Sequence, residues 1–202
     1  MTSVIKVDNI QNSTGATALS IDSSGNLTTS QLVLAHVVMT GDQNDKSEQT
    51  WNKMKWDSAI IDTKSGFDNS NERYTIPVAG YYRIYVQALL GVLGESNSAR
   101  DTGLCVTRTR NGTETEIALS TNRHYNGSND TSDATETIHV IDNCQVGDHI
   151  QFYTFVNTDT GTAYDVFANV DANDNTHMNN NLPSGSSEGN PITYFIIERI
   201  SG

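Results

Sequence analysis

The 202-residue sequence is poor in basic charge, in cysteine and in long apolar runs. Its 12 Lys and Arg residues face 24 Asp and Glu residues, and the formal net charge is −12. A phosphate backbone would therefore be repelled, so nucleic acid is excluded as a partner. Because no run approaches the roughly 18 apolar residues that span a bilayer, and the polar start lacks the apolar centre of a secretory signal, we expect no membrane insertion and synthesis in the cytosol.

Residues that carry chemistry are also scarce. Cys105 and Cys144 are the only cysteines. They make neither a disulfide framework nor a CxxC pair, so we expect two reduced, buried thiols. The five histidines show no HxH or HExxH spacing, and GxSxG, P-loop and GxGxxG motifs are absent. The sequence therefore predicts no enzyme, no catalytic residue and no cofactor.

Short apolar runs rich in Val, Ile, Tyr and Thr fill most of the chain, and clusters of Gly, Asn, Asp and Ser separate them. This pattern predicts an all-β fold of eight to ten strands without helix, arranged as an antiparallel sandwich or jelly roll. Pro77 and Gly80 divide residues 73–91 into a short strand and a long one. An Asn-Gly pair at 111–112 predicts a hairpin whose arms alternate core residues. The expected core residues are Trp51, Met54, Trp56, Leu104, Val106, Ile117 and Leu119.

The first thirty residues differ from the rest. They hold small apolar side chains between STG and SSGN turns, and no aromatic residue. Such a segment is too poor in large side chains to form a core alone, so it needs identical chains or another surface to pair with. We therefore expect two parts, an attachment segment over residues 1–30 and a head domain over residues 31–202.

Three separated motifs of the head carry a resemblance to a known fold. They are TWNKMKWDSAIIDTKSGFDNSNERYTIPVAGYYRIYVQALL at 50–90, VIDNCQVGDHIQFYTF at 140–155 and YFIIERI at 194–200. Together they resemble the tumour necrosis factor-like jelly roll, in the branch typified by the globular head of the first complement component and its viral relatives. The resemblance implies a homotrimer in which the long strand presents one face to the sandwich core and the other to the threefold axis.

Carried onto this sequence, the resemblance assigns a face to each residue of two strands. On the long strand it places Tyr82, Ile84, Val86 and Ala88 inside the protomer, and on the closing strand Phe195 and Ile197. The residues implied at the trimer interface are Tyr81, Arg83, Tyr85, Gln87, Leu89, Tyr194 and Ile196. Arg83 stands where an apolar residue is more common, so near an axis it needs a carboxylate, a carbonyl or an anion beside it, or else it lies in a more hydrated layer.

A second resemblance concerns the start of the chain. TSVIKVDNIQNSTGATALSIDSSGNLT, residues 2–28, is similar to the opening of tail-fibre and virion-surface proteins of marine tailed bacteriophages. The similarity implies that residues 1–30 bind other virion proteins. It also implies that the mature location is the virion, after synthesis in the host bacterial cytoplasm.

A polar stretch at about 158–190 interrupts the strand rhythm and holds at most one short strand. A loop of this length is typical of a functional segment. Aromatic and Met side chains in loops are candidates for contacting a host cell-surface glycan or protein, or else for covering the ends of the sandwich. They are Tyr125 in NRHYNGSNDTSD at 122–133, and Tyr164, Phe167 and Met178 in the long loop. Asp171 and Asp174 could hold calcium in a loose site, but Thr176 replaces the glycine of an EF-hand, and a solvated acidic loop is the alternative.

Three functions remain open from the sequence. The first is a trimeric phage virion protein, a short fibre, spike or decoration on capsid or tail that aids host adsorption or stabilises the particle. The second is a lectin-like carbohydrate-binding module on the same fold. The third is a polysaccharide hydrolase, whose paired acids would come from distant strands.

Overall fold

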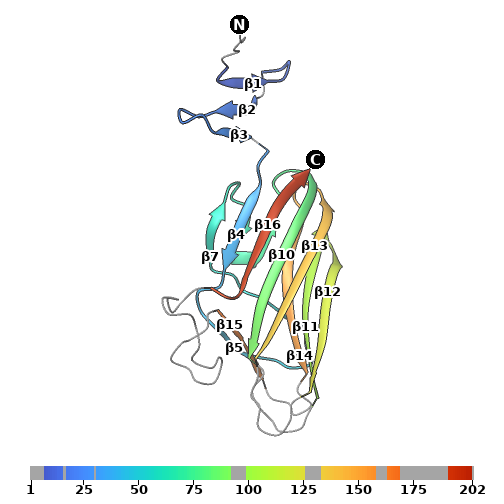
Figure 1. The fold of residues 1–202 in the computed structure, drawn as a ribbon. Coiled ribbons are helices and arrows are strands. Elements are labelled where there is room, and N and C mark those ends of the chain that lie inside the picture. The colour runs from blue at the N-terminus through green and yellow to red at the C-terminus, as the bar shows by residue number, and fades with distance from the viewer. Residues whose placement is uncertain are drawn as a thin grey trace.

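Two β-sheets packed face to face form an elongated sandwich, and a third, small sheet stands beyond one end of it (Figure 1). The computed structural model describes residues 7–15, 17–29, 31–91, 99–125, 133–157, 163–168 and 191–201. All the strand pairs in these ranges are antiparallel, so the predicted all-β sandwich is confirmed. Within the same ranges no helix has the length and apolar character to cross a membrane.

The first sheet surrounds a long central strand. Its order is β5 (Gln43–Lys46), β15 (Tyr164–Phe167), β10 (Gly80–Gly91), β16 (Tyr194–Ser201), β4 (Leu34–Val38) and β7 (Ser58–Asp62). On its other side, β10 pairs along its length with β13 (Ala134–Cys144). Because β10 has neighbours on both edges, its side chains point only to the two faces of the sheet.

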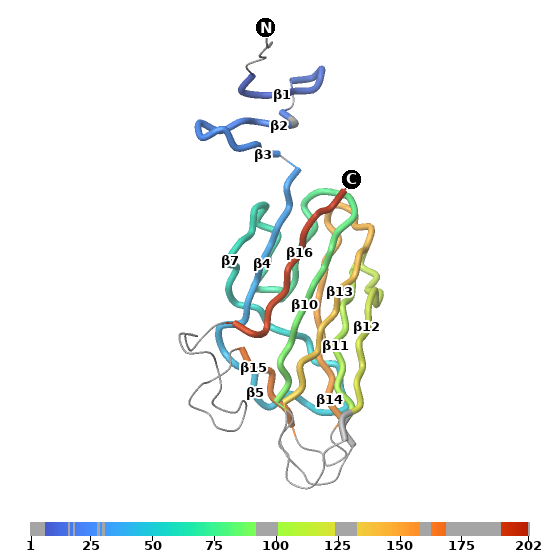
Figure 2. Tube along the Cα trace, in the orientation of Figure 1, coloured from blue at the N-terminus to red at the C-terminus, as the bar shows by residue number. Residues whose placement is uncertain are grey.

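The second sheet lies behind the first. Its order is β12 (Thr113–Tyr125), β11 (Ala99–Arg110), β14 (His149–Asn157), β9 (Arg73–Thr75) and β8 (Phe67–Asp68), and β6 (Asn52–Lys53) also pairs with β14. The predicted break after residue 75 is confirmed, since β9 belongs to the second sheet and β10 to the first, and the chain crosses between them at 76–79 (Figure 2). Gly80 is required at the crossing because a Cβ there would clash with the carbonyl oxygen of Ser201.

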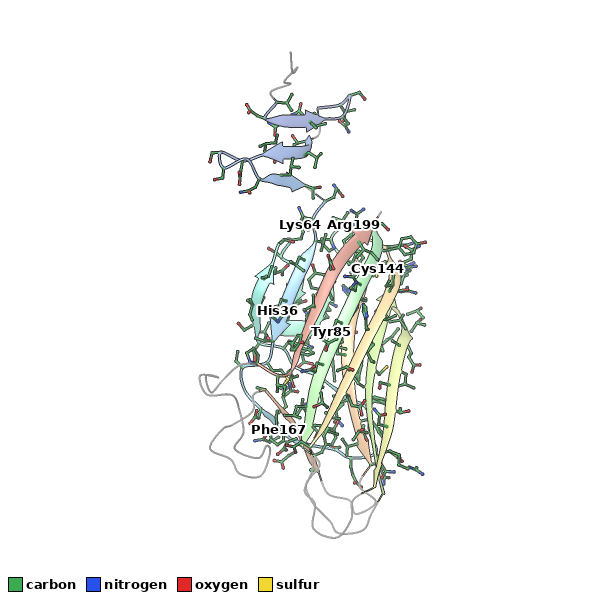
Figure 3. The ribbon with its side chains drawn as sticks, in the orientation of Figure 1. His36, Lys64, Tyr85, Cys144, Phe167 and Arg199 are labelled. Carbon is green, nitrogen blue, oxygen red and sulfur yellow. The ribbon has the colours of Figure 1, made fainter. Side chains whose placement is uncertain are left out.

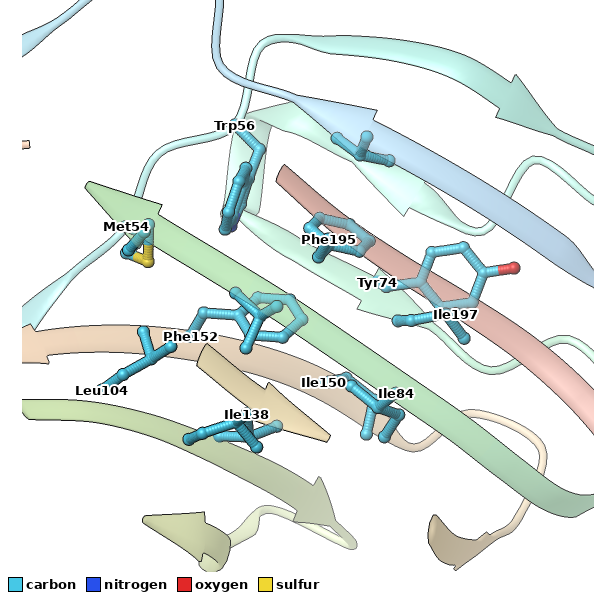
Figure 4. Packing of buried hydrophobic residues seen from close by; sticks show 14 of the residues in the cluster. Met54, Trp56, Tyr74, Ile84, Leu104, Ile138, Ile150, Phe152, Phe195 and Ile197 are labelled. Atoms are coloured by element: carbon cyan, nitrogen blue, oxygen red, sulfur yellow. The ribbon is translucent and has the colours of Figure 1, made fainter. Parts of the chain in front are cut away.

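An aromatic cluster joins the two sheets at the centre of the core (Figure 4). The ring of Phe195 on β16 stacks on that of Phe152 on β14, with centroids 4.7 Å apart. Trp56 meets both rings edge to face, at 4.9 Å from Phe195 and 5.5 Å from Phe152. Met54, Leu104 and Val106 are fully buried around this cluster, as the sequence predicted.

Two predicted core residues lie instead on the outer face of the second sheet. Leu119 is 48% exposed, because a bulge between Val106 and Thr107 shifts the register of β11 against β12 and places Leu119 opposite Cys105. One extra residue in a strand reverses the face of the side chains beyond it. Trp51 is 40% exposed and rests over Gly103, whose missing side chain leaves the space that the indole fills.

The strand count also exceeds the prediction. Short pairings at β5, β6 and β8 were not visible in the hydrophobic pattern. Residues 63–72, a polar segment, contain β8 and a 3₁₀ turn, η1 (Asn69–Asn71). Asp68 caps that turn by accepting the Asn71 backbone N–H at 3.1 Å. The predicted Asn-Gly hairpin is confirmed, with both Asn111 and Gly112 at positive φ.

The two thiols are reduced and buried, as expected. Burial, with a smaller contribution from nearby carboxylates, raises the pKa of Cys105 to about 11 and that of Cys144 to about 12. Cys144 belongs to the core between the sheets, whereas Cys105 is covered on the outer face of the second sheet beside Leu119. Both thiols are poor nucleophiles at neutral pH.

The small sheet contains β1 (Asn9–Gln11), β2 (Thr17–Ile21) and β3 (Leu27–Thr29). None of the side chains described in it is buried, and four large apolar ones are exposed: Val7, Ile10, Ile21 and Leu27. The sheet therefore has no core of its own, which agrees with the need for a partner. The exact domain boundary at residue 30 stays a prediction.

The Asp148 carboxylate gives the sandwich a specific acid sensitivity. Burial raises its pKa, but the hydrogen bonds from Arg110 and from the Gln145 N–H outweigh that effect and hold the pKa below the ordinary 3.8. The charged form therefore stabilises the fold above about pH 4, and this contribution is lost as the pH falls through the depressed pKa.

We expect Asp148→Asn to lower the free energy of unfolding by about 2 kcal/mol at neutral pH, because it removes a charge-assisted pair. The difference in the free energy of unfolding between the wild type and Asp148→Asn should decrease as the pH is lowered below about 4. Urea unfolding at a series of pH values measures this difference. Asp101→Asn is the control, because its partner Arg123 is 58% exposed and the loss should be smaller. A difference in the free energy of unfolding that stays constant down to the lowest pH would contradict the role given to the Asp148 carboxylate.

Candidate oligomer interface

The outer face of the first sheet is the candidate site, and β10 shows how it arises. Tyr82, Ile84, Val86 and Ala88 are fully buried in the core. The residues between them, Tyr81, Arg83, Tyr85 and Gln87, are exposed or half-buried on the outer face. On β16 Phe195 and Ile197 are buried, while Tyr194 and Ile196 are half-buried. The alternation expected within the protomer is thus confirmed; the trimer contacts themselves stay a prediction.

Leu89 is an exception to this alternation. Only 4% of it is exposed, because β15 continues the sheet beyond the end of β16 and sets Phe167 directly beside it. Phe167 in turn covers Gly91, where a Cβ would clash with its ring. Leu89 is therefore already buried in the protomer and does not offer an exposed side chain to a neighbouring chain.

Four aromatic rings form a row across four adjacent strands of this face. His36 on β4 meets Tyr194 on β16 at 5.4 Å, Tyr194 meets Tyr85 on β10 at 5.6 Å, and Tyr85 meets His139 on β13 at 6.5 Å. We call these residues the aromatic row; His36 and Tyr85 are marked in Figure 3. The two histidines were missed by the sequence analysis, because their places follow only from the pairing of His36 with Ile196 and of His139 with Tyr85.

Hydrogen bonds hold the centre of the aromatic row in place. The Tyr85 hydroxyl donates to Gln87 Oε1 at 3.1 Å, and Gln87 Nε2 donates to the Ile192 carbonyl at 2.8 Å. Burial raises the pKa of Tyr85, and the neighbouring Tyr194 raises it further. The Tyr85 hydroxyl is therefore uncharged at physiological pH, and its hydrogen bond to Gln87 preorganises the centre of the row.

Arg83 has a carboxylate partner, which is one of the alternatives that the sequence left open. Its Nη1 donates to Glu198 Oε2 at 3.2 Å from the directly opposed position on β16. The two side chains are 49% and 40% exposed, so the pair is not desolvated in the protomer. Arg83 thus adds no net charge to the face.

Exposed apolar side chains surround the aromatic row. Ile61 on β7 lies opposite His36, and Ile141 on β13 lies opposite Arg83. Ile61, Tyr81 and Ile141 are 40%, 49% and 55% exposed. An extended apolar face of this kind marks an interaction surface, whereas single exposed apolar residues do not.

Two of the four predicted receptor contacts are buried in the protomer. Tyr164 is fully buried, and its hydroxyl bonds with Thr154 Oγ1 at 3.0 Å and accepts from Asn52 Nδ2 at 3.1 Å. Phe167 is 8% exposed. Neither side chain can meet a receptor, because β15 is a strand of the first sheet and carries them into packed positions. The side chain of Tyr125, together with Met178 and the calcium candidates Asp171 and Asp174, lies outside the described residues.

The described residues offer little for catalysis. They contain no group of three His, Cys, Asp or Glu side chains that could hold a metal ion. A pocket of about 540 Å³ between the 111–112 turn and the 145–148 turn has one carboxylate in its lining, Asp148, which Arg110 already holds. Glycoside hydrolysis needs two carboxyl groups across the scissile bond, so this pocket does not fit it.

Comparison with solved structures agrees with this architecture. The sequence matches no protein-family model and no curated protein. The structure is similar to that of Eiger TNF from S. frugiperda, with a TM-score of 0.55 and 11% identity over 84% of this chain and 93% of that one. The fold is a TNF-like jelly roll. Two structures of murine APRIL are also similar, each with a TM-score of 0.45 over 68% of this chain, at 14% and 13% identity and over 98% and 99% of their own chains.

The coupling energy of the Arg83–Glu198 pair reports how far this face is exposed to solvent in the isolated protomer. We expect a double-mutant cycle of Arg83→Ala and Glu198→Ala, at protein concentrations that keep the chain monomeric, to give a coupling energy below about 1 kcal/mol. The matched control is the Arg110–Asp148 pair, whose carboxylate is 3% exposed and whose coupling should reach about 2 kcal/mol. Equal couplings for the two pairs would mean that the face is already dehydrated within one protomer.

Proposed function

We propose that this chain is a homotrimeric virion structural protein of a tailed bacteriophage. Its first thirty residues bind other virion proteins, and the TNF-like head projects as a short fibre, spike or decoration on capsid or tail. The observation that carries the proposal is the aromatic row with its exposed apolar surroundings, on a sheet whose other face is already the protomer core.

A homotrimer accounts for this face because three copies around an axis cover it without a different partner. Each apolar Å² removed from water contributes about 25 cal/mol, so burying the Tyr85, Tyr194 and Ile61 side chains on each protomer yields several kcal/mol. Because Arg83 and Glu198 pair and carry no net charge together, they add no charge repulsion of their own when three acidic chains meet at this face.

The placement of the small sheet supports an attachment role for the first thirty residues. β1–β3 lie beyond the end of the sandwich at which β4 begins and β16 finishes (Figure 1). β10, β12 and β14 finish at the opposite end, which we call the distal end. An anchor at one end leaves the distal end facing outward, where it serves host adsorption or the stability of the particle surface.

Two neighbouring substitutions on β10 separate assembly from folding. Tyr85→Asp places a charge on the outer face, and we expect it to weaken self-association at least a hundredfold while far-UV circular dichroism stays that of the wild type. Ile84→Asp buries an unpaired charge in the core and should prevent folding. Sedimentation velocity gives the mass; a wild-type chain that stays monomeric at about 100 μM would overturn the trimer.

The virion assignment has its own test. Antibodies raised against the head should label intact particles of the phage that encodes this chain, and the chain should copurify with them at a copy number divisible by three. We expect deletion of residues 1–30 to abolish incorporation while the head still folds and assembles. If purified particles lack the chain, the virion assignment is wrong, whereas the proposed trimer is unaffected by that result.

A further inference from the structure

The outer face of the second sheet carries one exposed aromatic platform among mostly polar neighbours. Trp51 precedes β6, and its indole lies 5.2 Å from the ring of Phe155 on β14, measured between centroids. The indole covers Gly103 on β11, where a Cβ would lie 2.8 Å from Trp51 Cη2. We call Trp51 and Phe155 over Gly103 the Trp51 platform.

The platform contributes little to the core. The chain has two tryptophans, and Trp56 is 1% exposed in the central cluster, whereas Trp51 is 40% exposed. Gly103, Phe155 and Trp51 lie on the side of the second sheet opposite the core residues Leu104 and Val156. The exposed part of the Trp51 indole is therefore accessible to a ligand without any loss of core packing.

Planar polar side chains border the platform on the side toward the distal end. Asp101 lies two residues before Gly103 on β11 and therefore points to the same outer face. It is opposite Arg123 on β12 and Asn157 on β14. Arg123 Nε and Nη2 donate to the two Asp101 oxygens at 2.6 and 2.9 Å, and Gln49 Nε2 donates to Asn157 Oδ1 at 3.1 Å. These contacts fix a guanidinium, a carboxylate and two amides in a row beside the aromatic rings, with Arg123 58% exposed.

We propose that the Trp51 platform binds a pyranose unit of a neutral glycan. A pyranose ring has a face of C–H groups, which an indole face attracts through its negative quadrupole, and a rim of hydroxyl groups. Guanidinium, carboxylate and amide groups in one row are the donors and acceptors that match that rim. The net charge of −12 disfavours an anionic polysaccharide, so the ligand chemistry is a neutral hexose or N-acetylhexosamine.

The site is independent of the candidate oligomer interface, because it belongs to the other sheet and to the opposite side of the sandwich. It lies near the distal end, where β11 begins and β14 finishes (Figure 1). On a particle-bound head this end faces the host, which gives the site access to surface glycans. Binding should nevertheless be measurable on the free protein, whether or not it is a trimer.

The test uses the full chain and a set of neutral hexasaccharides of glucose, galactose, mannose and N-acetylglucosamine, with a hexamer of galacturonic acid as the anionic probe. Calorimetry should detect at least one neutral ligand with a dissociation constant of about 0.1–1 mM. Trp51→Ala should weaken that binding at least tenfold. Gly103→Ala, which lifts the indole off the sheet, should weaken it severalfold while leaving circular dichroism unchanged.

Tryptophan emission supplies a second readout. The ligand should shift the emission of the wild type and leave that of Trp51→Ala unchanged, because the remaining Trp56 is buried. Tyr85→Asp is the control, and its affinity per site should equal that of the wild type. The proposal fails if no neutral hexamer binds at about 10 mM, if Trp51→Ala binds as well as the wild type, or if the galacturonic acid hexamer binds best. It also fails if Trp51→Ala changes the sedimentation mass, since the platform would then be a contact between copies.

Discussion

The two-residue period of β10 and β16 is the constraint on which the rest of the structure depends. Phe195 and Ile84 must point into the core, because the aromatic cluster that joins the sheets needs them there. Tyr194 and Tyr85 are then forced outward on strands with neighbours on both edges. No register shift can bury one set without exposing the other, so the apolar outer face is a fixed consequence of the core.

The same core separates two outer faces with different chemistry. The first sheet presents aromatic rings and aliphatic side chains, and the Arg83–Glu198 ion pair joins two of its strands. The second sheet presents mostly polar side chains, with one indole held over a glycine. An extended apolar face favours contact with another copy of a folded chain, whereas a single ring with hydrogen-bonding groups beside it matches a small amphipathic ligand.

The sequence was sufficient where the signal was local. The division at Pro77 and Gly80, the Asn-Gly hairpin and the alternation along residues 80–88 all follow from neighbouring residues. It failed where the cause lay on another strand. Leu119 is outside because of a bulge, Trp51 is outside because Gly103 leaves room for it, and Leu89 is covered because β15 lies beside it. The partner of Arg83 is 115 residues away, so no local pattern could have named Glu198.

Placing assembly and ligand binding on different sheets also sets how strong each contact must be. A flat platform with one indole and a few hydrogen bonds buries little ligand surface, so a single site can be no more than weak. In the proposed trimer three such platforms would point toward the same distal end, and linked sites of this kind gain roughly a hundredfold or more in avidity without any new contact. In that assembly a weak site on one sheet and an oligomer interface on the opposite sheet would be complementary, because the interface would supply avidity and the platform would supply specificity for the ligand.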